Sequence, residues 1–266
     1  MIQSRYTARS GLNTLQQRLD TIANYLANVG TTGFKGARAD FKTLMFQELQ
    51  RPVQPQADDN LNRGVGASLG ATTRSFAAGT PISTGYGLDF LLQGDGFFTV
   101  QDSDGELSYT RDGSFALSTE GNATYLVTSD GSYVMGKNNQ RINVQGANIS
   151  DIQTAADGRV FVVKTDNTVT PPTQTFTQVG QLDIKKFMNR KGLEAVGANK
   201  FRPTDNSGAA QDDADTHVVQ GYQEGSNVDM AQEMTRLIRT QRVFSLVSSA
   251  LTTADEMDHQ ANIIRG

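Results

Sequence analysis

The stretch LNTLQQRLDTIANYLANV (residues 12–29) decides the fold at one end of the chain. Its apolar side chains form two series, each with a period of seven residues. The members are Leu12, Leu19 and Leu26 in one series and Leu15, Ile22 and Val29 in the other. Such a period is typical of a helix that packs lengthwise along another helix, as in a coiled coil. Because neither Gly nor Pro interrupts the segment after Gly11, we predict one helix over residues 1–29.

The other end of the chain carries a matching apolar face at helical spacing. Its residues are Met234, Leu237, Phe244, Val247, Leu251 and Ala254. Ser226 or Asn227 is expected to cap this helix. The carboxylates of Asp229 and Glu233 then lie near its positive end. The two ends are therefore predicted to pack together as a helical, coiled-coil-like terminal domain.

The helical ends are expected to form an assembly interface. An isolated helix of this length is only marginally stable in water, so we expect the ends to order fully when other copies of the chain supply apolar surface. Asn24 and Asn28 lie four residues apart on one face and are either polar surface residues or side chains that fix the register of neighbouring chains. The predicted interface residues are Leu12, Leu15, Leu19, Ile22, Asn24, Leu26, Asn28, Val29, Met234, Leu237, Phe244, Val247 and Leu251.

The segment after the first helix has a different composition. Gly30 and Gly33 end the helix. A short apolar group follows and predicts either a second short helix or an irregular apolar patch; it consists of Phe41, Leu44, Met45 and Leu49. Residues 52–70 are rich in Pro, Gln, Asp, Asn and Gly, which is typical of an extended linker.

The middle of the chain alternates apolar and polar residues in short runs, which predicts β-strands. The runs lie at residues 90–92, 96–100, 107–110, 114–117, 124–127, 133–135, 142–144, 160–163 and 181–184. Asp-Gly or Gly-Asn pairs at 104–105, 112–113, 121–122 and 130–131 indicate hairpin turns.

The expected fold class is α+β, with a mainly antiparallel β middle domain in the form of an irregular sandwich or barrel. The predicted boundaries are 1–30 and 226–266 for the terminal helical assembly domain, 31–75 for an extended connector, and 76–225 for the β-rich middle domain.

Composition excludes several classes of function. The chain has 266 residues, a formal net charge of −4 with both signs interspersed, and no apolar run near the roughly 20 residues of a membrane span. Neither a nucleic-acid surface nor membrane insertion is expected. The absence of Cys excludes disulfides, thiolate metal sites and a Cys nucleophile. The N-terminal residues lack the features of a secretory signal, so any export is expected to proceed without a cleaved signal peptide.

The sequence holds no set of residues that supports catalysis. His217 and His259 are widely separated and have no nearby partner for a metal site. Asp102, Asp104 and Gly105 resemble the start of a calcium loop, but position 113 is Gly where such a loop needs Glu, so a tight turn is favoured. We therefore expect no enzyme, no cofactor and no metal.

Phe97 and Phe98 are adjacent in a predicted strand and so point to opposite faces. Two arrangements remain open. Either one ring is in the core and the other is exposed or at an interface, or both are buried between layers.

Four blocks of sequence resemble the bacterial flagellar rod and hook family of axial proteins. IANYLANV at 22–29 with TGFK at 32–35 resembles the family's signature I-x-N-N-L-A-N-x-x-T-x-G-F-K and departs from it at Tyr25. LD at 88–89 with GDGFF at 94–98, and YTRDGSF at 109–115, resemble motifs of the family's middle domain. GY at 221–222 and SNV at 226–228, with Glu233, resemble the start of its C-terminal helix.

The resemblance implies a structural subunit whose terminal helices line the inside of a helical tube, with β domains outside. It implies a rod member rather than a hook member, since hook subunits are longer. Torque transmission from motor to hook would be its function. Its partners would be further copies of the chain, other rod and hook proteins, and the flagellar type III export apparatus, and its location would be the basal body outside the cytoplasmic membrane. A second hypothesis is a secreted β-rich module that binds calcium or a glycan and oligomerises through its helical ends.

Overall fold

The structure, a computed structural model, describes residues 2–44, 46–50, 61–64, 66–121, 123–144, 147–166 and 173–265. The chain divides into two compact units. The first, called here the helical unit, consists of Met1–Ala27, Ala37–Arg74 and Val228–Gly266. The second, called the β-rich unit, consists of Asn28–Gly36 and Ser75–Asn227.

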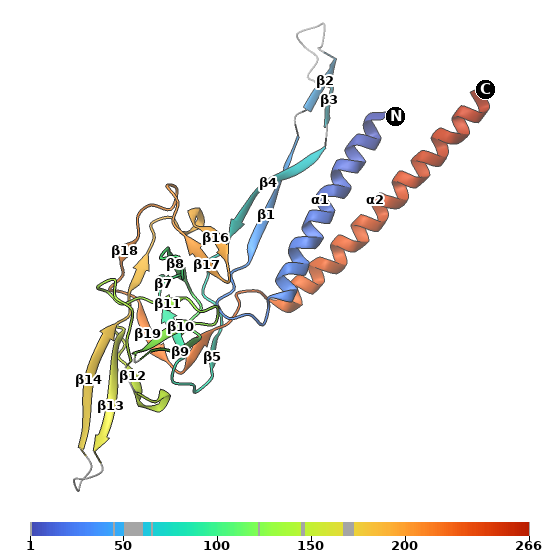
Figure 1. Cartoon of the computed structure of the whole chain (residues 1–266). Coiled ribbons are helices and arrows are strands. Elements are labelled where there is room, and N and C mark those ends of the chain that lie inside the picture. Colours follow the sequence, from blue (N-terminus) through green and yellow to red (C-terminus); the bar gives the residue numbers. More distant parts are fainter. Residues whose placement is uncertain are drawn as a thin grey trace. The chain divides into compact units, whose positions relative to one another are not determined.

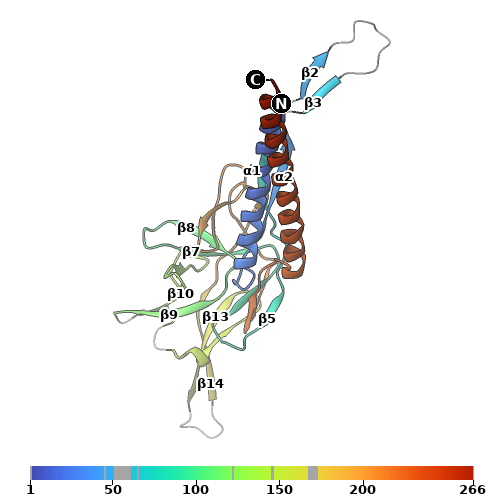
Figure 2. The ribbon, with the colours of Figure 1, turned by 90° about the vertical axis from the view of Figure 1, so that its right-hand side faces the viewer.

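Two helices dominate the helical unit. Helix α1 spans Ile2–Ala27 and helix α2 spans Met230–Arg265. They lie side by side in both views, α1 in blue and α2 in orange to red (Figures 1 and 2). The predicted helices at the two ends of the chain are therefore confirmed. Neither described helix combines the length and the apolar character that crossing a bilayer requires.

The cap of α2 differs from the sequence expectation. The carboxylate of Asp229 accepts hydrogen bonds from the backbone N–H groups of Ala231 and Gln232, at 2.9 and 3.2 Å. Asp229 is thus the capping residue, because a carboxylate at this position satisfies N–H groups that have no partner within the helix. The prediction of Ser226 or Asn227 as the cap was wrong, since Asp229 takes this position and the side chain of Asn227 binds backbone groups of the β-rich unit.

Strands complete the helical unit. β1 (Ala37–Thr43) pairs with β4 (Ala67–Arg74), and β2 (Phe46–Gln50) pairs with β3 (Leu61–Gly64), all antiparallel. Phe41 lies in β1 and Leu49 in β2, so the predicted second short helix was wrong. β-branched and aromatic residues and an antiparallel partner strand outweigh the helical spacing of this short segment. Met45 and residues 51–60 of the predicted linker lie outside the described residues.

The β-rich unit contains the remaining described strands. They are β5 Pro81–Ser83, β6 Phe90–Gln93, β7 Phe97–Gln101, β8 Leu107–Thr110, β9 Phe115–Glu120, β10 Ala123–Thr128, β11 Tyr133–Val134, β12 Ile152–Thr154, β13 Arg159–Asp166, β14 Thr173–Gln181, β15 Ile184–Lys186, β16 Glu194–Gly197, β17 Lys200–Arg202, β18 Gln211–Asp212, β19 His217–Gln220 and β20 Tyr222–Glu224. Nine of them form one antiparallel sheet with the order β16-β17-β8-β7-β11-β10-β9, in which β15 also pairs with β7 and β18 pairs with β15. The smaller sheets are β12-β13-β14, β19-β6 and β20-β5. In both views the β13–β14 hairpin extends away from the rest of this unit (Figures 1 and 2). No barrel closes among the described strands, so the mainly antiparallel β middle is confirmed without the barrel.

The predicted runs at 90–92, 96–100, 107–110, 114–117, 124–127, 133–135 and 160–163 overlap observed strands. The run at 181–184 was wrong as one strand, because Leu182 and Asp183 lie between β14 and β15, and β5, β12 and β16 to β20 were not predicted. Two 3₁₀ turns occur at Ile149–Asp151 and Arg190–Gly192. The predicted strand at 142–144 is only a site of isolated bridges.

Two hydrophobic clusters form the core of the β-rich unit. Phe98 belongs to the larger cluster with Leu88, Phe90 and Phe115, whereas Phe97 belongs to a second, aromatic cluster. Both rings are fully buried. Of the two arrangements considered for this pair, the structure has the one in which both side chains are core residues, because β7 lies between the two clusters.

Candidate assembly surface and docked segment

Along the inner face of α2, positions of low solvent exposure recur with a period of seven residues. Its least exposed positions are Glu233, Leu237, Thr240, Phe244, Val247, Leu251, Ala254 and Asp258, which are alternately four and three residues apart. This spacing keeps one face of a helix turned toward a partner helix. Arg5 of α1 forms ion pairs across the helix pair with Asp255 and Asp258, at 2.6 and 3.3 Å. The predicted face is therefore the one that packs against α1, except for Met234, which is exposed.

The predicted interface residues differ in exposure within the single chain. Ile22 is buried and Asn24 is exposed. Met234 is exposed, and Asn28 and Val29 follow α1 in the β-rich unit. The half-buried members are Leu12, Leu15, Leu19, Leu26, Leu237, Phe244, Val247 and Leu251. Their role as contacts between copies of the chain stays a prediction.

The outer face of α2 carries a second set of apolar side chains, most of which the sequence analysis missed. They are Met230, Met234, Ile238, Val243, Leu246, Met257, Ile263 and Ile264. Ile238 and Leu246 are 51% and 70% exposed. Many exposed large apolar side chains on one helix are typical of a surface that another protein surface covers. The signal was present in the sequence as apolar residues off the heptad face.

The segment Thr32–Gly36, called here the docked segment, lies within the β-rich unit although it directly follows the α1 region. The hydroxyl of Thr32 donates to Asp112 Oδ1 at 2.9 Å, and the side-chain amide of Asn199 donates to the Thr32 carbonyl at 2.9 Å. The N–H of Gly33 donates to the Glu224 carbonyl at 2.7 Å. Gly33 has φ +65°, and a Cβ on it would lie 2.7 Å from the backbone nitrogen of Asp112. Only glycine fits this close approach.

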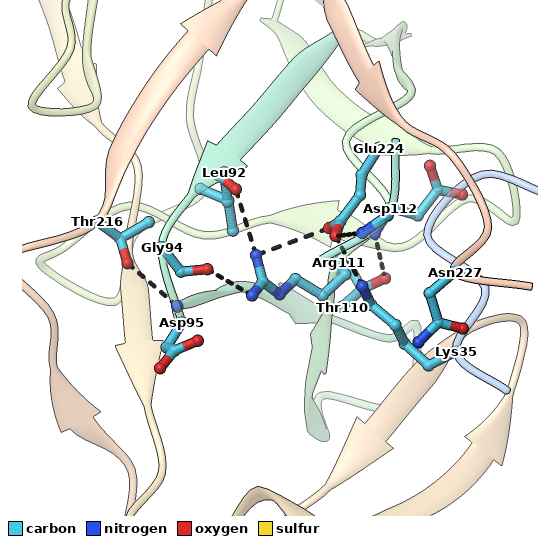
Figure 3. A network of polar contacts seen from close by, with 12 residues as sticks. Lys35, Leu92, Gly94, Asp95, Thr110, Arg111, Asp112, Thr216, Glu224 and Asn227 are labelled. Atoms are coloured by element: carbon cyan, nitrogen blue, oxygen red, sulfur yellow. Dashed lines mark hydrogen bonds and ion pairs between the residues drawn. The ribbon is translucent and has the colours of Figure 1, made fainter. Parts of the chain in front are cut away.

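Lys35 enters a buried ionic cluster with Arg111 and Glu224 (Figure 3). Lys35 Nζ lies 2.7 Å from Glu224 Oε1 and also donates to the Ala77 carbonyl at 2.8 Å. Arg111 Nη1 lies 3.6 Å from Glu224 Oε2. All three side chains are at most 2% exposed. Burial is the main cause that lowers the pKa of both Lys35 and Arg111, and Glu224 opposes this shift.

Backbone groups complete the cluster. Arg111 donates to the carbonyls of Leu92 and Gly94, at 3.3 and 2.6 Å, and Gly79 N–H donates to Glu224 Oε1 at 2.9 Å. Two buried cations thus share one carboxylate, with carbonyl oxygens supplying further acceptors. A buried charge without partners is costly, so this set of contacts stabilises the arrangement only while it is complete.

The cluster joins three of the sequence blocks that carried the family resemblance. Lys35 ends the TGFK block, Arg111 belongs to the YTRDGSF block, and Glu224 follows the GY block in β20. Sequence reasoning noted these blocks without finding that their charged residues meet. The only signal in the sequence would have been a Lys or Arg inside an otherwise apolar motif, because such a residue is rarely buried unless an opposite charge pairs with it.

The candidate calcium loop is a turn. Asp102 accepts from Ser103 N–H and Gly105 N–H closes the turn onto the Asp102 carbonyl, with φ +83° at Gly105. The ammonium of Lys200 pairs with Asp130 and donates to Ser132, whose hydroxyl also faces Asp102. A lysine therefore occupies the position next to these carboxylates. His217 and His259 are both exposed, on β19 and α2.

Family profiles match three parts of the chain. Residues 6–35 match the flagella basal body rod protein profile, residues 91–162 match the D1 domain of the flagellar hook protein FlgE/F/G profile, and residues 219–264 match the C-terminal profile of flagellar basal body rod FlgEFG proteins. The first and third profiles together cover most of both helices, and the second covers β8 and Arg111, which directly follows it.

Known relatives match the chain along nearly its whole length. The flagellar basal-body rod protein FlgG of Agrobacterium fabrum is 37% identical over 261 residues, which cover 94% of each chain. That of Borreliella burgdorferi is 35% identical, with 100% of this chain and 99% of the relative covered. The flagellar hook-basal body complex protein FlhP of Bacillus subtilis is 27% identical over both full lengths. This chain therefore belongs to the FlgG family of flagellar basal-body rod proteins.

Proposed function

We propose that the chain is a structural subunit of the bacterial flagellar rod that polymerises through its terminal helices into a helical tube and transmits torque from motor to hook. The observation that carries this proposal is the pairing of two long helices, of which α2 leaves several large apolar side chains exposed on the side away from α1. Full-length similarity to rod proteins supports it. Residues 46–52 resemble the segment that follows the first helix in the distal rod subunit, which favours the distal over the proximal position.

The proposal includes the finer features expected from the sequence. The helices act as a coiled-coil-like assembly domain over 1–30 and 226–266, joined through 31–75 to the β-rich domain over 76–225. The predicted residues from Leu12 to Val29 and from Met234 to Leu251 contribute to contacts between copies. Export proceeds through the flagellar type III apparatus without a cleaved signal peptide, and the assembled protein lies outside the cytoplasmic membrane. The function requires no chemical step.

The exposed residues of α2 extend the proposed interface. Burying one Leu or Ile side chain against a neighbouring copy contributes roughly 1.5–3 kcal/mol, and about 1.4 kcal/mol corresponds to a tenfold change in an association constant. Because one contact repeats in every subunit of a tube, weakening it in the chain weakens it everywhere along the polymer. Replacing one exposed apolar residue of the subunit is therefore a sensitive test of whether that residue contributes to assembly.

Replacing the chromosomal copy of the gene in its own bacterium tests the function. Cells that lack the chain should form no complete rod and should not swim, and the wild-type chain should restore both. The double variant Ile238→Gln/Leu246→Gln should fail to restore swimming, whereas Ser245→Gln, which changes an exposed polar residue of the same helix, should restore it. Rods are counted by electron microscopy of isolated basal bodies. Swimming without the chain would overturn the proposed function, and swimming of the double variant would overturn the interface.

The ligand-binding alternative loses its structural basis. Its motive was the run of Asp-Gly turns, and in the turn at Asp130 the carboxylate pairs with the ammonium of Lys200, which also donates to Ser132 beside Asp102. The matching relatives are rod proteins by name.

A further inference from the structure

The β-rich unit is built from two separate pieces of chain, Asn28–Gly36 and Ser75–Asn227. The chain therefore leaves or re-enters this unit at Gly36, Ser75 and Asn227, in addition to Asn28. These three positions are called here the exit cluster. In sequence they are 39, 152 and 191 residues apart, taken pairwise from Gly36 to Ser75, from Ser75 to Asn227 and from Gly36 to Asn227. Nothing in local sequence holds them together.

The side chain of Asn227 binds the other two members of the exit cluster. Its Oδ1 accepts a hydrogen bond from Gly36 N–H at 2.9 Å, and its Nδ2 donates to the Ser75 carbonyl at 2.8 Å. A longer contact, at 3.4 Å, joins Nδ2 to the Ala77 carbonyl. One carboxamide thus uses both its acceptor and its donor group on backbone atoms. An amide is the neutral side-chain group that can do both at once.

Backbone hydrogen bonds also connect the members of the exit cluster and their neighbours. Ser75 N–H donates to the Gly36 carbonyl at 2.8 Å, and Asn227 N–H donates to the Phe34 carbonyl at 3.3 Å. The neighbouring Lys35 ammonium donates to the Ala77 carbonyl, so Lys35 and Gly36 of the docked segment both bind the piece of chain that begins at Ser75. Figure 3 shows Asn227 beside Lys35 at the edge of the ionic cluster. The three chain ends are therefore linked to one another and not only to the sheet.

We propose that Asn227 is a positioning residue that holds the exit cluster together, so that the three chain ends of the β-rich unit move as one. This inference concerns the unassembled chain and does not depend on the proposed rod function. The physical reason is that these hydrogen bonds are made by the same residues. An amide that holds the backbone of Gly36 and of Ser75 also keeps these two residues at the distance at which they bind each other, so losing it loosens a bond that it does not itself make. The bond from Ser75 N–H to the Gly36 carbonyl is the diagnostic one, because no atom of Asn227 takes part in it.

Amide hydrogen exchange on the full-length monomer tests the proposal. In Asn227→Ala, the exchange rates of the Gly36 and Ser75 amides should both rise roughly tenfold. This factor corresponds to losing the free energy of one hydrogen bond. Thr99 N–H, which donates to the Asp183 carbonyl within the sheet, should keep its rate. The matched control Asn138→Asp changes an exposed asparagine of the same unit and should alter none of these rates.

Asn227→Asp provides the second variant if the alanine variant fails to fold. It has nearly the same size and retains an acceptor for Gly36 N–H, but it loses both donors and places negative charge near the Ser75 carbonyl. Faster exchange at Ser75 in this variant, with Thr99 unchanged, supports the proposal. An unchanged exchange rate at Ser75 overturns the proposal, because it shows that the chain ends are independent of one another. An equal acceleration at Ser75 and Thr99 also overturns it, because it shows a uniform loss of stability.

Discussion

The ammonium of Lys35 and the carboxylate of Glu224 lie 2.7 Å apart, and both side chains are almost completely withdrawn from solvent. Arg111 shares the same carboxylate, at 3.6 Å. The cluster therefore holds one positive charge in excess. This imbalance decides what each substitution does.

Glu224→Gln is expected to be the more damaging substitution in the cluster. It leaves two buried cations without an anion, and removing one partner of a buried pair costs about 3–5 kcal/mol. Lys35→Met should cost clearly less, because Arg111 remains to balance Glu224. Urea unfolding of the full-length protein measures both. Lys164→Met, at an exposed lysine of β13, is the control and should change the free energy of unfolding by less than about 0.5 kcal/mol. A greater loss for Lys35→Met than for Glu224→Gln would contradict the shared-carboxylate arrangement.

Asp112 is expected to make stability depend on acidic pH. Burial raises its pKa, although hydrogen bonds from Ser114 N–H and the Thr32 hydroxyl oppose the shift. A raised pKa means that the folded state takes up a proton at a higher pH than the unfolded state. The contribution of Asp112 to stability should therefore increase as pH falls from its raised pKa to 3.8.

Asp112→Asn tests this dependence. The amide oxygen can still accept both hydrogen bonds while the buried charge is removed. The variant should be more stable than the wild type at neutral pH, and its advantage should shrink as the pH falls toward 3.8. Chemical denaturation at a series of pH values gives the comparison, with Asp104→Asn in an exposed turn as the control. A difference between variant and wild type that stays constant over this range would show that Asp112 does not titrate with a raised pKa.

Gly113 is expected to tolerate no side chain. A Cβ on it would overlap the carbonyl of Phe90 and lie 3.2 Å from the Phe98 ring. Gly113→Ala should therefore cost about 3 kcal/mol or more, at the upper end of overpacking costs. Gly105→Ala is the matched control, since Gly105 has a positive φ but open space around it, and it should cost about 1–2 kcal/mol. Equal losses in thermal unfolding for the two variants would show that the chain adjusts around position 113.

The terminal helices are expected to gain their full order on assembly. Hydrogen exchange on the dilute monomer should show fast exchange over residues 5–27 and 230–264 and slow exchange in the strands between residues 85 and 200. The reason is that much of α2 is exposed to solvent in the single chain, so each of its residues buries little apolar surface. Protected helices in the dilute monomer would mean that pairing of α1 with α2 suffices, and coupled folding and assembly would have to be abandoned.

Local sequence determined the elements of this protein. The seven-residue apolar series predicts α1 and the inner face of α2, and alternation between Asp-Gly turns predicts most strands from β6 to β13. These signals act over a few residues, through side-chain periodicity and turn conformation, so they can be recognised without the fold. They fail where a segment is short, as around Phe41, because an antiparallel partner far along the chain then decides between helix and strand.

Only the tertiary structure decided which polar residues meet. Lys35 and Glu224 are 189 positions apart, and Gly36 and Asn227 are 191 apart. Asn227 is a good helix cap by local rules, yet its amide is used on Gly36 and Ser75, and Asp229 caps α2 instead. A hydrogen bond or a buried ion pair depends on distances of about 3 Å between atoms that the packing of the whole chain brings together. Residue type and local spacing carry no information about such distances, and this is why the docked segment and the exit cluster became visible only in the folded protein.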